Sequence, residues 1–286
     1  MRRILCALSF LSILTTYAQV WSPDGSQLAF FYIHAIEDIY LVNTDGSNFQ
    51  VLDQHPERDF MPDWSPEGNS LIFTSVRDGN HQIYRMDLAT RETERLIVSD
   101  DEDTDGHFSS DGKKVVFSSN RSGNSDLFIY DLEDKTISAL TQTSTFEYTP
   151  RWSPDGKKIL YKMASDEFGA SDLYVMDIKT RQKEQVTIGQ RGEFHQNWSP
   201  GGDKICYVQV TEGVFELWVL DIKTREKQVL VKKEGYQLFY PNWSPDGQFI
   251  AFTRDLSEGQ QEGYPALYMV NMEGKESLVS AENSFE

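Results

Sequence analysis

The sequence predicts an all-β protein, a six-bladed β-propeller built from four-stranded blades. Two observations carry this prediction. The motif Trp-Ser-Pro-Asp-Gly occurs three times in identical form and three times as a variant, at intervals of 43 to 46 residues. Each copy is followed by the same succession of short apolar runs and turn-forming residues. An internal repeat of this period, with four short strands in each unit, is typical of propeller blades.

The motif itself predicts a tight turn between two strands. The six copies begin, in chain order, at Trp21, Trp64, Phe108, Trp152, Trp198 and Trp243. Proline fixes φ at the first corner of such a turn, and glycine supplies the positive φ with which the chain re-enters a strand. We therefore expect a strand to end at each motif aromatic and a second strand to begin just after each glycine.

The rest of each repeat follows in the same order. An apolar run such as 71–73 predicts the second strand, and a polar loop separates it from an apolar–aromatic strand such as 83–84. That third strand ends at an Asp or Asn, such as Asp87, whose side chain favours a turn by bonding its own backbone two residues on. A last strand, such as 227–230, completes the blade.

The two ends of the chain are expected to meet and close the ring. Residues 279–286 align without a gap on residues 140–147. On this alignment the chain ends two residues short of the point where its first repeat began, so that the seam falls inside or beside one strand. Radial closure of this kind leaves few exposed strand edges. The propeller is then a single domain over residues 19–286.

The first 18 residues predict a secretory signal peptide. Arg2 and Arg3 precede an apolar run over 4–14, and small residues up to Ala18 favour cleavage before Gln19. The apolar run is too short to span a bilayer, so no membrane insertion is expected. The mature protein is expected to be periplasmic or secreted. It would retain only Cys206, which lies in an apolar strand and is expected to be buried.

The net charge of -18 limits the classes of partner. It argues against a nucleic-acid-binding protein, because such proteins neutralise phosphates with basic side chains. It argues equally against docking on an anionic membrane surface. Two interpretations remain open: the acidity serves solubility alone, or it attracts a cationic partner or a metal ion.

A further repeated feature is a Ser-x-Arg-x-Gly loop at 75–79 and 119–123, before strands of the Ile-Tyr-x-x-Asp type. Together with the Trp-Ser-Pro-Asp-Gly turns, it resembles the β-propeller repeat of the TolB family. The resemblance covers the whole mature chain, although the fourth to sixth repeats lack the loop. It implies a propeller that binds a protein of the cell envelope, because the family's propeller binds a peptidoglycan-associated lipoprotein.

The resemblance does not extend to every activity of that family. TolB carries an α/β domain ahead of its propeller, whereas here the first blade follows directly on the predicted signal peptide, so the activity of that domain is not expected. Similar blades also occur in oligogalacturonate lyases and in propellers that gate some serine peptidases. No Gly-x-Ser-x-Gly nucleophile motif is present in the sequence.

The first candidate site is a series of carboxylates five residues before each motif aromatic. The series holds Asp59, Asp103, Glu147 and Glu193, Leu238 interrupts it, and the alignment of the chain ends adds Glu286. At the channel mouth these groups would form an electronegative funnel for a cation or a basic side chain. The alternative is that they bond nearby backbone amides. On the first interpretation, neutralising Asp59, Glu147 and Glu193 together weakens partner binding and leaves the fold intact.

The second candidate is a calcium loop. Asp101, Asp103 and Asp105 place acidic oxygens at alternate positions before Gly106, as a calcium loop begins. The twelfth position, where a bidentate Glu belongs, is Gly112. The alternative is an ordinary blade strand.

The third candidate is a pair of histidines, His107 and His195, which lie just before their motif aromatics and could face the channel together. They would suit a metal-assisted, oligogalacturonate-lyase-like enzyme acting on glycans; the alternative is a hydrogen-bonded structural role for each. We favour a non-catalytic binding or scaffold propeller, monomeric and without a cofactor, that recognises a protein in the bacterial periplasm or cell envelope. The glycan-active enzyme is the second hypothesis.

Overall fold

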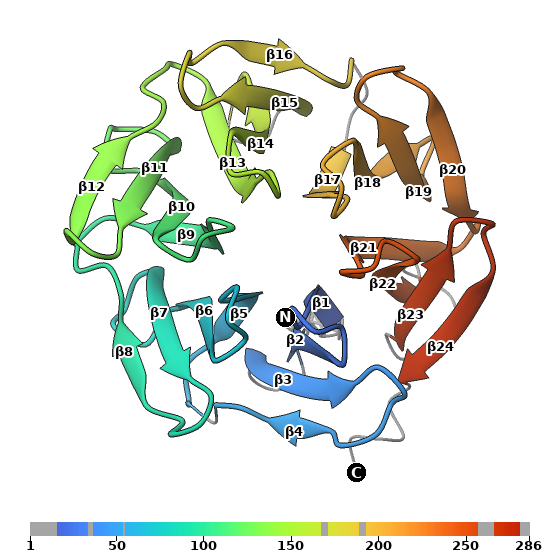
Figure 1. Cartoon of the computed structure of the whole chain (residues 1–286), viewed down its shortest axis with the longest axis horizontal. Coiled ribbons are helices and arrows are strands. Elements are labelled where there is room, and N and C mark those ends of the chain that lie inside the picture. Colours follow the sequence, from blue (N-terminus) through green and yellow to red (C-terminus); the bar gives the residue numbers. More distant parts are fainter. Residues whose placement is uncertain are drawn as a thin grey trace, which may run out of the picture.

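A computed structural model confirms the six-bladed, all-β architecture. It describes residues 16–33, 37–53, 55–166, 171–188, 193–256 and 266–280. Six antiparallel sheets of four strands surround a central axis, and each sheet is built from four successive strands (Figure 1). Blade 1 is β1–β4, and blade 6 is β21–β24. No helix in the described residues has the length and apolarity to cross a membrane.

The strands have the following bounds. The innermost are β1 (Thr16–Trp21), β5 (Asp59–Trp64), β9 (Asp103–Phe108), β13 (Phe146–Trp152), β17 (Glu193–Trp198) and β21 (Tyr236–Trp243). The second strands are β2 (Gln27–Ile33), β6 (Ser70–Ser75), β10 (Lys114–Ser119), β14 (Lys158–Ala164), β18 (Lys204–Thr211) and β22 (Phe249–Leu256). The third strands are β3 (Glu37–Asn43), β7 (Gln82–Asp87), β11 (Asp126–Asp131), β15 (Ser171–Asp177), β19 (Val214–Asp221) and β23 (Ala266–Asn271). The outermost are β4 (Gln50–Val51), β8 (Thr93–Arg95), β12 (Thr136–Ala139), β16 (Lys183–Gln185), β20 (Lys227–Lys232) and β24 (Glu276–Ser280).

The seam of the ring lies between two complete sheets. Blade 1 takes its innermost strand from the N-terminal side, where Thr16 pairs with Tyr32. Thr16 is five residues before Trp21, so it holds the place in blade 1 that the alignment of the chain ends assigned to Glu286. Glu286 itself lies outside the described residues. Residues 16–18, which belong to the predicted signal peptide, extend β1 toward its start.

The motif turns are held by their own side chains. In blade 1, Gly25 has φ 73° and its N–H donates to Ser22 O. The Ser22 hydroxyl donates to Asp24 Oδ1 at 2.6 Å and accepts the N–H of Gln27 at 2.9 Å. Blade 5 lacks the motif Asp, and there Asp203 accepts from the serine hydroxyl instead, at 3.0 Å. In all six blades the turn serine thus donates to a side-chain oxygen of its own turn, as expected for a turn motif.

The same turns join neighbouring blades. The indole of Trp64 donates to Val20 O in blade 1 at 3.1 Å, and that of Trp21 donates to Asn242 O in blade 6 at 3.0 Å. A Cβ built on Gly25 would lie 3.7 Å from Cδ of Pro245, which places the turns of blades 1 and 6 in contact. The first and last blades are thus joined by the contacts that join other neighbours, and the ring is closed.

The hydrophobic core consists of clusters that each span two adjacent blades. One cluster combines Leu160 and Leu173 of blade 4 with Ile205 and Tyr207 of blade 5. Another combines Leu28 of blade 1 with residues of blade 6. Because a blade buries its apolar faces only against its neighbours, the blades depend on one another for stability. Cys206 lies in such a cluster and is fully buried, as predicted.

Candidate functional site

The channel opens on two chemically different faces. Because the four strands of a blade run antiparallel, the turn after each innermost strand and the hairpin before each outermost strand lie on one face, which we call the turn face. The loops between second and third strands, and the connections from blade to blade, lie on the opposite face, which we call the loop face. Each innermost strand begins at the loop face and ends at its motif aromatic on the turn face.

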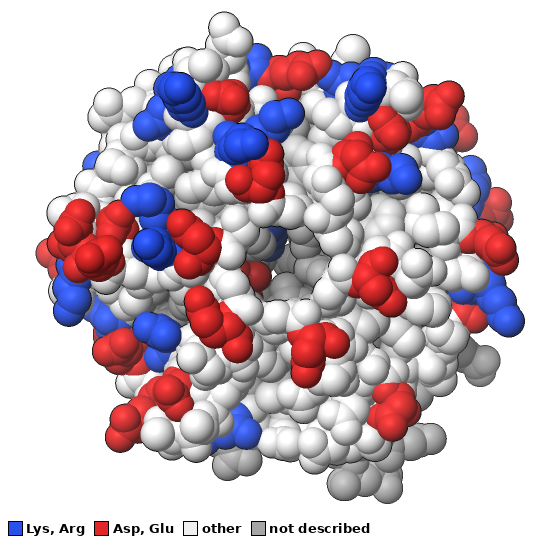
Figure 2. Space-filling view, viewed as in Figure 1, with Lys and Arg blue, Asp and Glu red and all other residues white. Residues whose placement is uncertain are grey.

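The turn face has a hollow of about 320 Å³ at the channel mouth. It is lined by the motif aromatics and turn prolines, and by the polar side chains of Asp63, His107, Asn197 and Asn242. Figure 2 shows this hollow at the centre of the molecule, with acidic side chains spaced around its rim. The mouth thus combines an apolar wall with a negatively charged rim.

The rim charge comes from the motif turns themselves. The exposed turn carboxylates are those of Asp24, Glu67, Asp111, Asp155 and Asp246. Hydrogen bonds from the turn hydroxyls of Ser22 and Ser26 lower the pKa of Asp24 to about 2. The corresponding serine hydroxyls are also the main reason that the pKa values of Asp111, Asp155 and Asp246 are lowered. These four carboxylates are therefore ionised throughout the physiological pH range.

Inside the channel, every blade from 2 to 6 has a bulge in its innermost strand. The residue three before the motif aromatic has φ between 49° and 57°, although none of these residues is glycine: Met61, Asp105, Thr149, His195 and Tyr240. The strand registers shift at the same places. Bulges of this kind redirect side chains, and non-glycine residues at positive φ are uncommon. The bulge recurs at the same position in five blades, so it is a regular structural element of the channel wall.

The bulge residues and their neighbours make contacts from blade to blade. Gln196 of blade 5 donates through Nε2 to Thr149 O of blade 4 at 2.7 Å. The ring of His195 lies on that of Tyr240 in blade 6, with 3.5 Å between the ring centroids. Together with the turn contacts, these interactions fix the blades at the axis.

A cluster of charged groups lies at the turn-face end of the channel. Asp63 Oδ2 accepts the N–H of Phe108 at 2.9 Å, and Asp63 Oδ1 lies 3.7 Å from His107 Nε2. Burial raises the pKa of Asp63 to about 7, opposed by the Phe108 N–H and by the charge of Arg151. Burial also raises the pKa of Asp105, opposed by the same guanidinium.

The two histidines of the predicted pair lie in different cavities. His107 lines the turn-face hollow, and its Nδ1 accepts the N–H of Trp152 at 3.4 Å. His195 lines a smaller cavity deeper in the channel, beside Arg151. Burial, together with nearby positive charge, lowers the pKa of His195 to about 3 and holds the pKa of His107 well below its ordinary value. Both rings are therefore neutral at physiological pH.

The carboxylates at the starts of the innermost strands lie at the loop face. Asp59, Asp103 and Glu147 have no exposed area. Asp59 pairs with Arg77 at 2.8 Å, and Asp103 pairs with Arg121 at 2.6 Å. In blade 4, Glu147 Oε1 accepts from the hydroxyls of two threonines, each at 2.7 Å.

The arginine partners belong to the Ser-x-Arg-x-Gly loops. Arg77 lies over the ring of Tyr84, 4.7 Å from its centroid, and Arg121 lies over the ring of Phe128 at 5.0 Å. Each ion pair is thus an internal link of one blade. Glu193 begins β17 and pairs with Gln209 in register, but its side chain and Glu286 lie outside the described part of the chain.

Because of these contacts, the variant that neutralises Asp59, Glu147 and Glu193 together does not measure partner binding alone. We expected that replacing Asp59, Glu147 and Glu193 would leave the fold intact. Asp59 and Glu147 are fully buried and bonded within their own blades, so their removal leaves buried polar partners unsatisfied. The triple variant would lose stability as well as any binding, and it does not isolate a partner site.

The structure separates the three aspartates of the predicted calcium loop. Asp101 precedes β9, whereas Asp103 and Asp105 lie within that strand. Asp103 bonds Arg121, while Asp105 lies in the channel near Arg151 and Lys162. Among the residues that the structure describes, no group of three His, Cys, Asp or Glu side chains is placed to hold a metal ion.

Sequence reasoning missed several channel residues, including Asp63, Arg151 and Tyr240. A signal for two of them was available at the position just before each motif aromatic. That position holds Val20, Asp63, His107, Arg151, Asn197 and Asn242. Five of these six residues are polar, which is unusual for a position next to a buried aromatic in an inner strand, and all five line the turn-face hollow or the cavity beneath it.

Comparison with known proteins agrees with this architecture. A family model described as the TolB beta propeller domain matches residues 12–119 and 104–285. A TolB homolog of Chlorobium luteolum is 33% identical over 73 residues, which cover 26% of this chain and 17% of that protein. The Tol-Pal system protein TolB of Bordetella pertussis is 28% identical over 114 residues, covering 24% of this chain and 26% of that protein. The matched stretches are thus well under two thirds of either relative's length.

Solved structures share the fold at low sequence identity. TolB from Acinetobacter baumannii superposes with a TM-score of 0.72 and 24% identity, covering 81% of this chain and 57% of that chain. An oligogalacturonate lyase in complex with manganese superposes with a TM-score of 0.65 and 19% identity, covering 94% of this chain and 78% of that chain. At these identities the likeness establishes the fold and no activity.

The buried ion pair of Asp103 predicts an asymmetry between two neighbouring aspartates. Asp103→Asn should lower the free energy of unfolding by about 3–5 kcal/mol, because it leaves the charge of Arg121 buried without its partner. Asp101→Asn should change it by less than about 0.5 kcal/mol, because that side chain makes no comparable contact. Urea unfolding of both variants checks this. Equal losses of stability in the two variants would contradict the structural role of Asp103. If calcium stabilises the unmodified chain and neither variant, the calcium-loop hypothesis would instead be supported.

The raised pKa of Asp63 predicts a pH dependence of stability. The folded protein holds this proton up to about pH 7, whereas the unfolded chain releases it near 3.8. Folded molecules therefore bind more protons over that interval, and stability falls as pH rises through it, by up to about 4 kcal/mol from this group. Asp63→Asn keeps an acceptor for the Phe108 N–H and should flatten the profile between pH 4 and 7. The free energy of unfolding is measured by urea unfolding at each pH. If its dependence on pH is the same for Asp63→Asn and the unmodified chain, Asp63 ionises normally.

Proposed function

Because the chain belongs to the TolB β-propeller domain family, we propose that it is a monomeric, non-catalytic binding propeller of the bacterial cell envelope that recognises a protein partner through its turn face. The observation that carries this proposal is the charged rim of the turn face. Five exposed turn carboxylates surround a hollow lined by tryptophans and prolines.

The physical chemistry of this mouth suits a protein with a basic surface. Like charges placed around the mouth raise the negative potential above the hollow and accelerate association with cationic partners. The hollow beneath the rim has apolar walls that suit an inserted anchor side chain. Because the rim carboxylates keep their charge at physiological pH, the attraction does not depend on a titrating switch.

The relatives support a protein partner in the envelope. Several are named as the TolB protein of a Tol-Pal system. For the same reason we propose export: Arg2, Arg3 and the apolar run over 4–14 act as a signal that is removed before Gln19. Removal would shorten β1 but leave Trp21 and its contacts with blade 6 in place.

The alternative of a metal-assisted enzyme on glycans gains no specific support. His107 and His195 line separate cavities, and each is bonded or stacked against a neighbouring blade. The hypothesis that they act together therefore lacks the geometry that it requires.

Neutralising the rim should weaken partner binding without loss of stability. The variant combines Asp24→Asn, Asp111→Asn, Asp155→Asn and Asp246→Asn, and asparagine keeps the oxygen that accepts the turn hydrogen bonds. We expect a loss of roughly tenfold or more in association rate with the protein captured from an envelope extract, with the remaining binding less sensitive to salt. Surface plasmon resonance at two salt concentrations measures both quantities.

The matched control removes four charges from the loop face. Glu57→Gln, Asp100→Asn, Glu212→Gln and Glu234→Gln change exposed residues and give the same net charge. This variant should bind as the unmodified chain does. If both variants lose binding equally, the partner responds to net charge alone and the turn-face proposal fails.

The export half of the proposal is checked by intact mass. The chain recovered from the periplasmic fraction or the medium of an expressing bacterium should begin at Gln19. A chain that begins at Met1 and stays with the cytoplasmic fraction would contradict export.

A further inference from the structure

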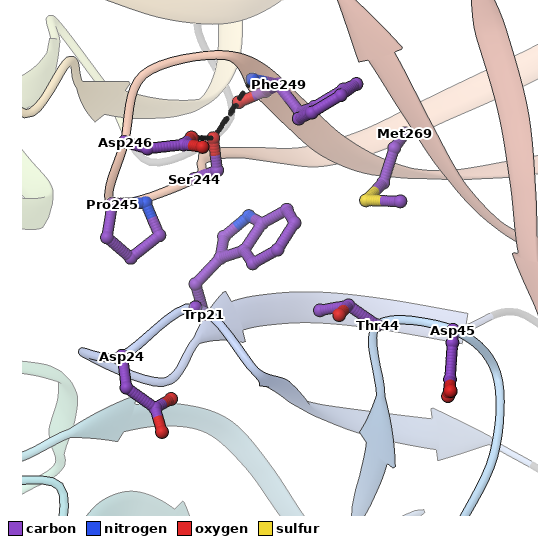
Figure 3. Close-up of a pocket in the computed structure, with 10 residues that line it drawn as sticks. Trp21, Asp24, Thr44, Asp45, Ser244, Pro245, Asp246, Phe249 and Met269 are labelled. Atoms are coloured by element: carbon purple, nitrogen blue, oxygen red, sulfur yellow. Dashed lines mark hydrogen bonds between the residues drawn. The ribbon is translucent and has the colours of Figure 1, made fainter.

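A second cavity opens on the turn face, between blades 6 and 1. It has a volume of about 370 Å³. Figure 3 shows its walls: the indole of Trp21 stands at the centre of the view, with the ring of Phe249 and the side chain of Met269 on the blade 6 side. Thr44 of blade 1 lies beside the indole. The cavity is separate from the channel mouth, although Trp21 and Pro245 line both.

The apolar walls of this cavity are unusually open. The four other motif tryptophans are only 5 to 8% exposed, whereas Trp21 is partly exposed. Phe249 is 37% exposed, which places it among the most exposed large apolar residues of the described chain. Exposed aromatic surface in a formed cavity is a feature of binding sites.

All the charged residues that line the cavity are acidic. Asp24, Asp45 and Asp246 contribute three carboxylates and no basic residue lines the cavity. The turn hydroxyls and amides that hold these groups all bond Oδ1. Those bonds lower all three pKa values, so the cavity carries its negative charge at physiological pH.

The repeat supplies an internal comparison. The equivalent cavity between blades 3 and 4, of about 420 Å³, has Lys114 where this one has Phe249, and Ile129 where this one has Met269. The ammonium of Lys114 pairs with Asp131 there. The fold thus holds a cation of its own in the equivalent cavity.

Between blades 6 and 1 that internal cation is missing. The position of Lys114 is aromatic, and the position of its partner Asp131 is the uncharged Asn271. Three carboxylates therefore border a cavity that has no positive charge among its lining residues and whose other walls include two aromatic rings and a methionine.

We propose that this cavity binds an arginine or lysine side chain of the partner protein. The alkyl stem would pack on Met269 and Phe249, and the cation would lie over the Trp21 indole, attracted by the negative charge that Asp24, Asp45 and Asp246 place around the cavity. Cations are attracted to the face of an indole, and methionine and aromatic walls adapt to an alkyl stem. The inference rests on the proposed function, since it names the chemistry by which the turn face would recognise its protein.

A peptide titration tests the site without the partner. The probes are acetyl-Gly-Arg-Gly-amide, its lysine counterpart, and a citrulline counterpart that is neutral and similar in shape. The indole N–H resonance of Trp21 in the full chain is followed by NMR and assigned with Trp21→Phe. The arginine and lysine peptides should shift this resonance in a saturable manner, and the citrulline peptide should not. An equal shift from citrulline, or none from any peptide, overturns the proposal.

Two variants provide matched controls. Phe249→Lys introduces the lysine found in the cavity between blades 3 and 4. It should lower the affinity for the arginine peptide at least tenfold. Lys114→Gln alters that other cavity and should leave the titration unchanged. If Phe249→Lys binds the peptide as tightly as the unmodified chain, the cavity is not the site.

The partner experiment separates this inference from the proposed function. Phe249→Lys should also lower the affinity for the captured partner protein. If the rim variant loses the partner while Phe249→Lys keeps it, the turn face remains the docking surface and the cavity inference is wrong. If the peptides bind but no protein is captured by the turn face, the cation site stands and its assignment to a protein partner is wrong.

Discussion

The structure depends on the contact between the motif turn of one blade and the turn of the next. In three blades the motif tryptophan indole donates to a backbone carbonyl of the preceding blade: Trp21 to Asn242, Trp64 to Val20 and Trp198 to Arg151. The turn proline packs against the next turn glycine, as Pro23 does against Gly68. Since the same contacts join blade 6 to blade 1, the ring closes without a strand shared between the two ends of the chain. Each apolar cluster then spans two blades, so a closed ring is the condition for burying all of them.

The same turns determine the chemistry of one face. In four of the six turns the aspartate that accepts from the turn serine is exposed, and the hydrogen bonds of the turn lower its pKa and keep it ionised. Repetition around the axis converts a local structural device into a charged rim. At the loop face, the strand-initial carboxylates of Asp59 and Asp103 are instead buried and paired with arginines of their own blades, and Glu147 is buried against threonine hydroxyls. The repeated carboxylates of the motif turns are therefore exposed to solvent, whereas the repeated carboxylates at the strand starts serve within the fold.

The fold was predictable from the sequence because it is encoded locally and repeatedly. Turn residues and apolar runs recur at one period, and each repeat predicts the same four strands. The site was less predictable, because the repeat does not state which way a side chain points. Asp59 and Asp103 were expected at the channel mouth, and nothing in their spacing revealed that they begin innermost strands where Arg77 and Arg121 cover them. His107 and His195 have similar sequence positions, yet a bulge of one residue directs them into different cavities. The motif aspartates were interpreted only as turn formers, and their exposure around the rim emerged when six turns were placed in a circle.

Site-specific photo-crosslinking in the cell shows whether the partner is recognised on the turn face. A photoreactive amino acid replaces Ser110 on the turn face in one strain and Glu212 on the loop face in another; both positions are exposed. After irradiation, the account predicts a discrete protein adduct from position 110 and none of the same mass from position 212. A discrete adduct from position 212 alone would place the partner on the loop face and contradict the account.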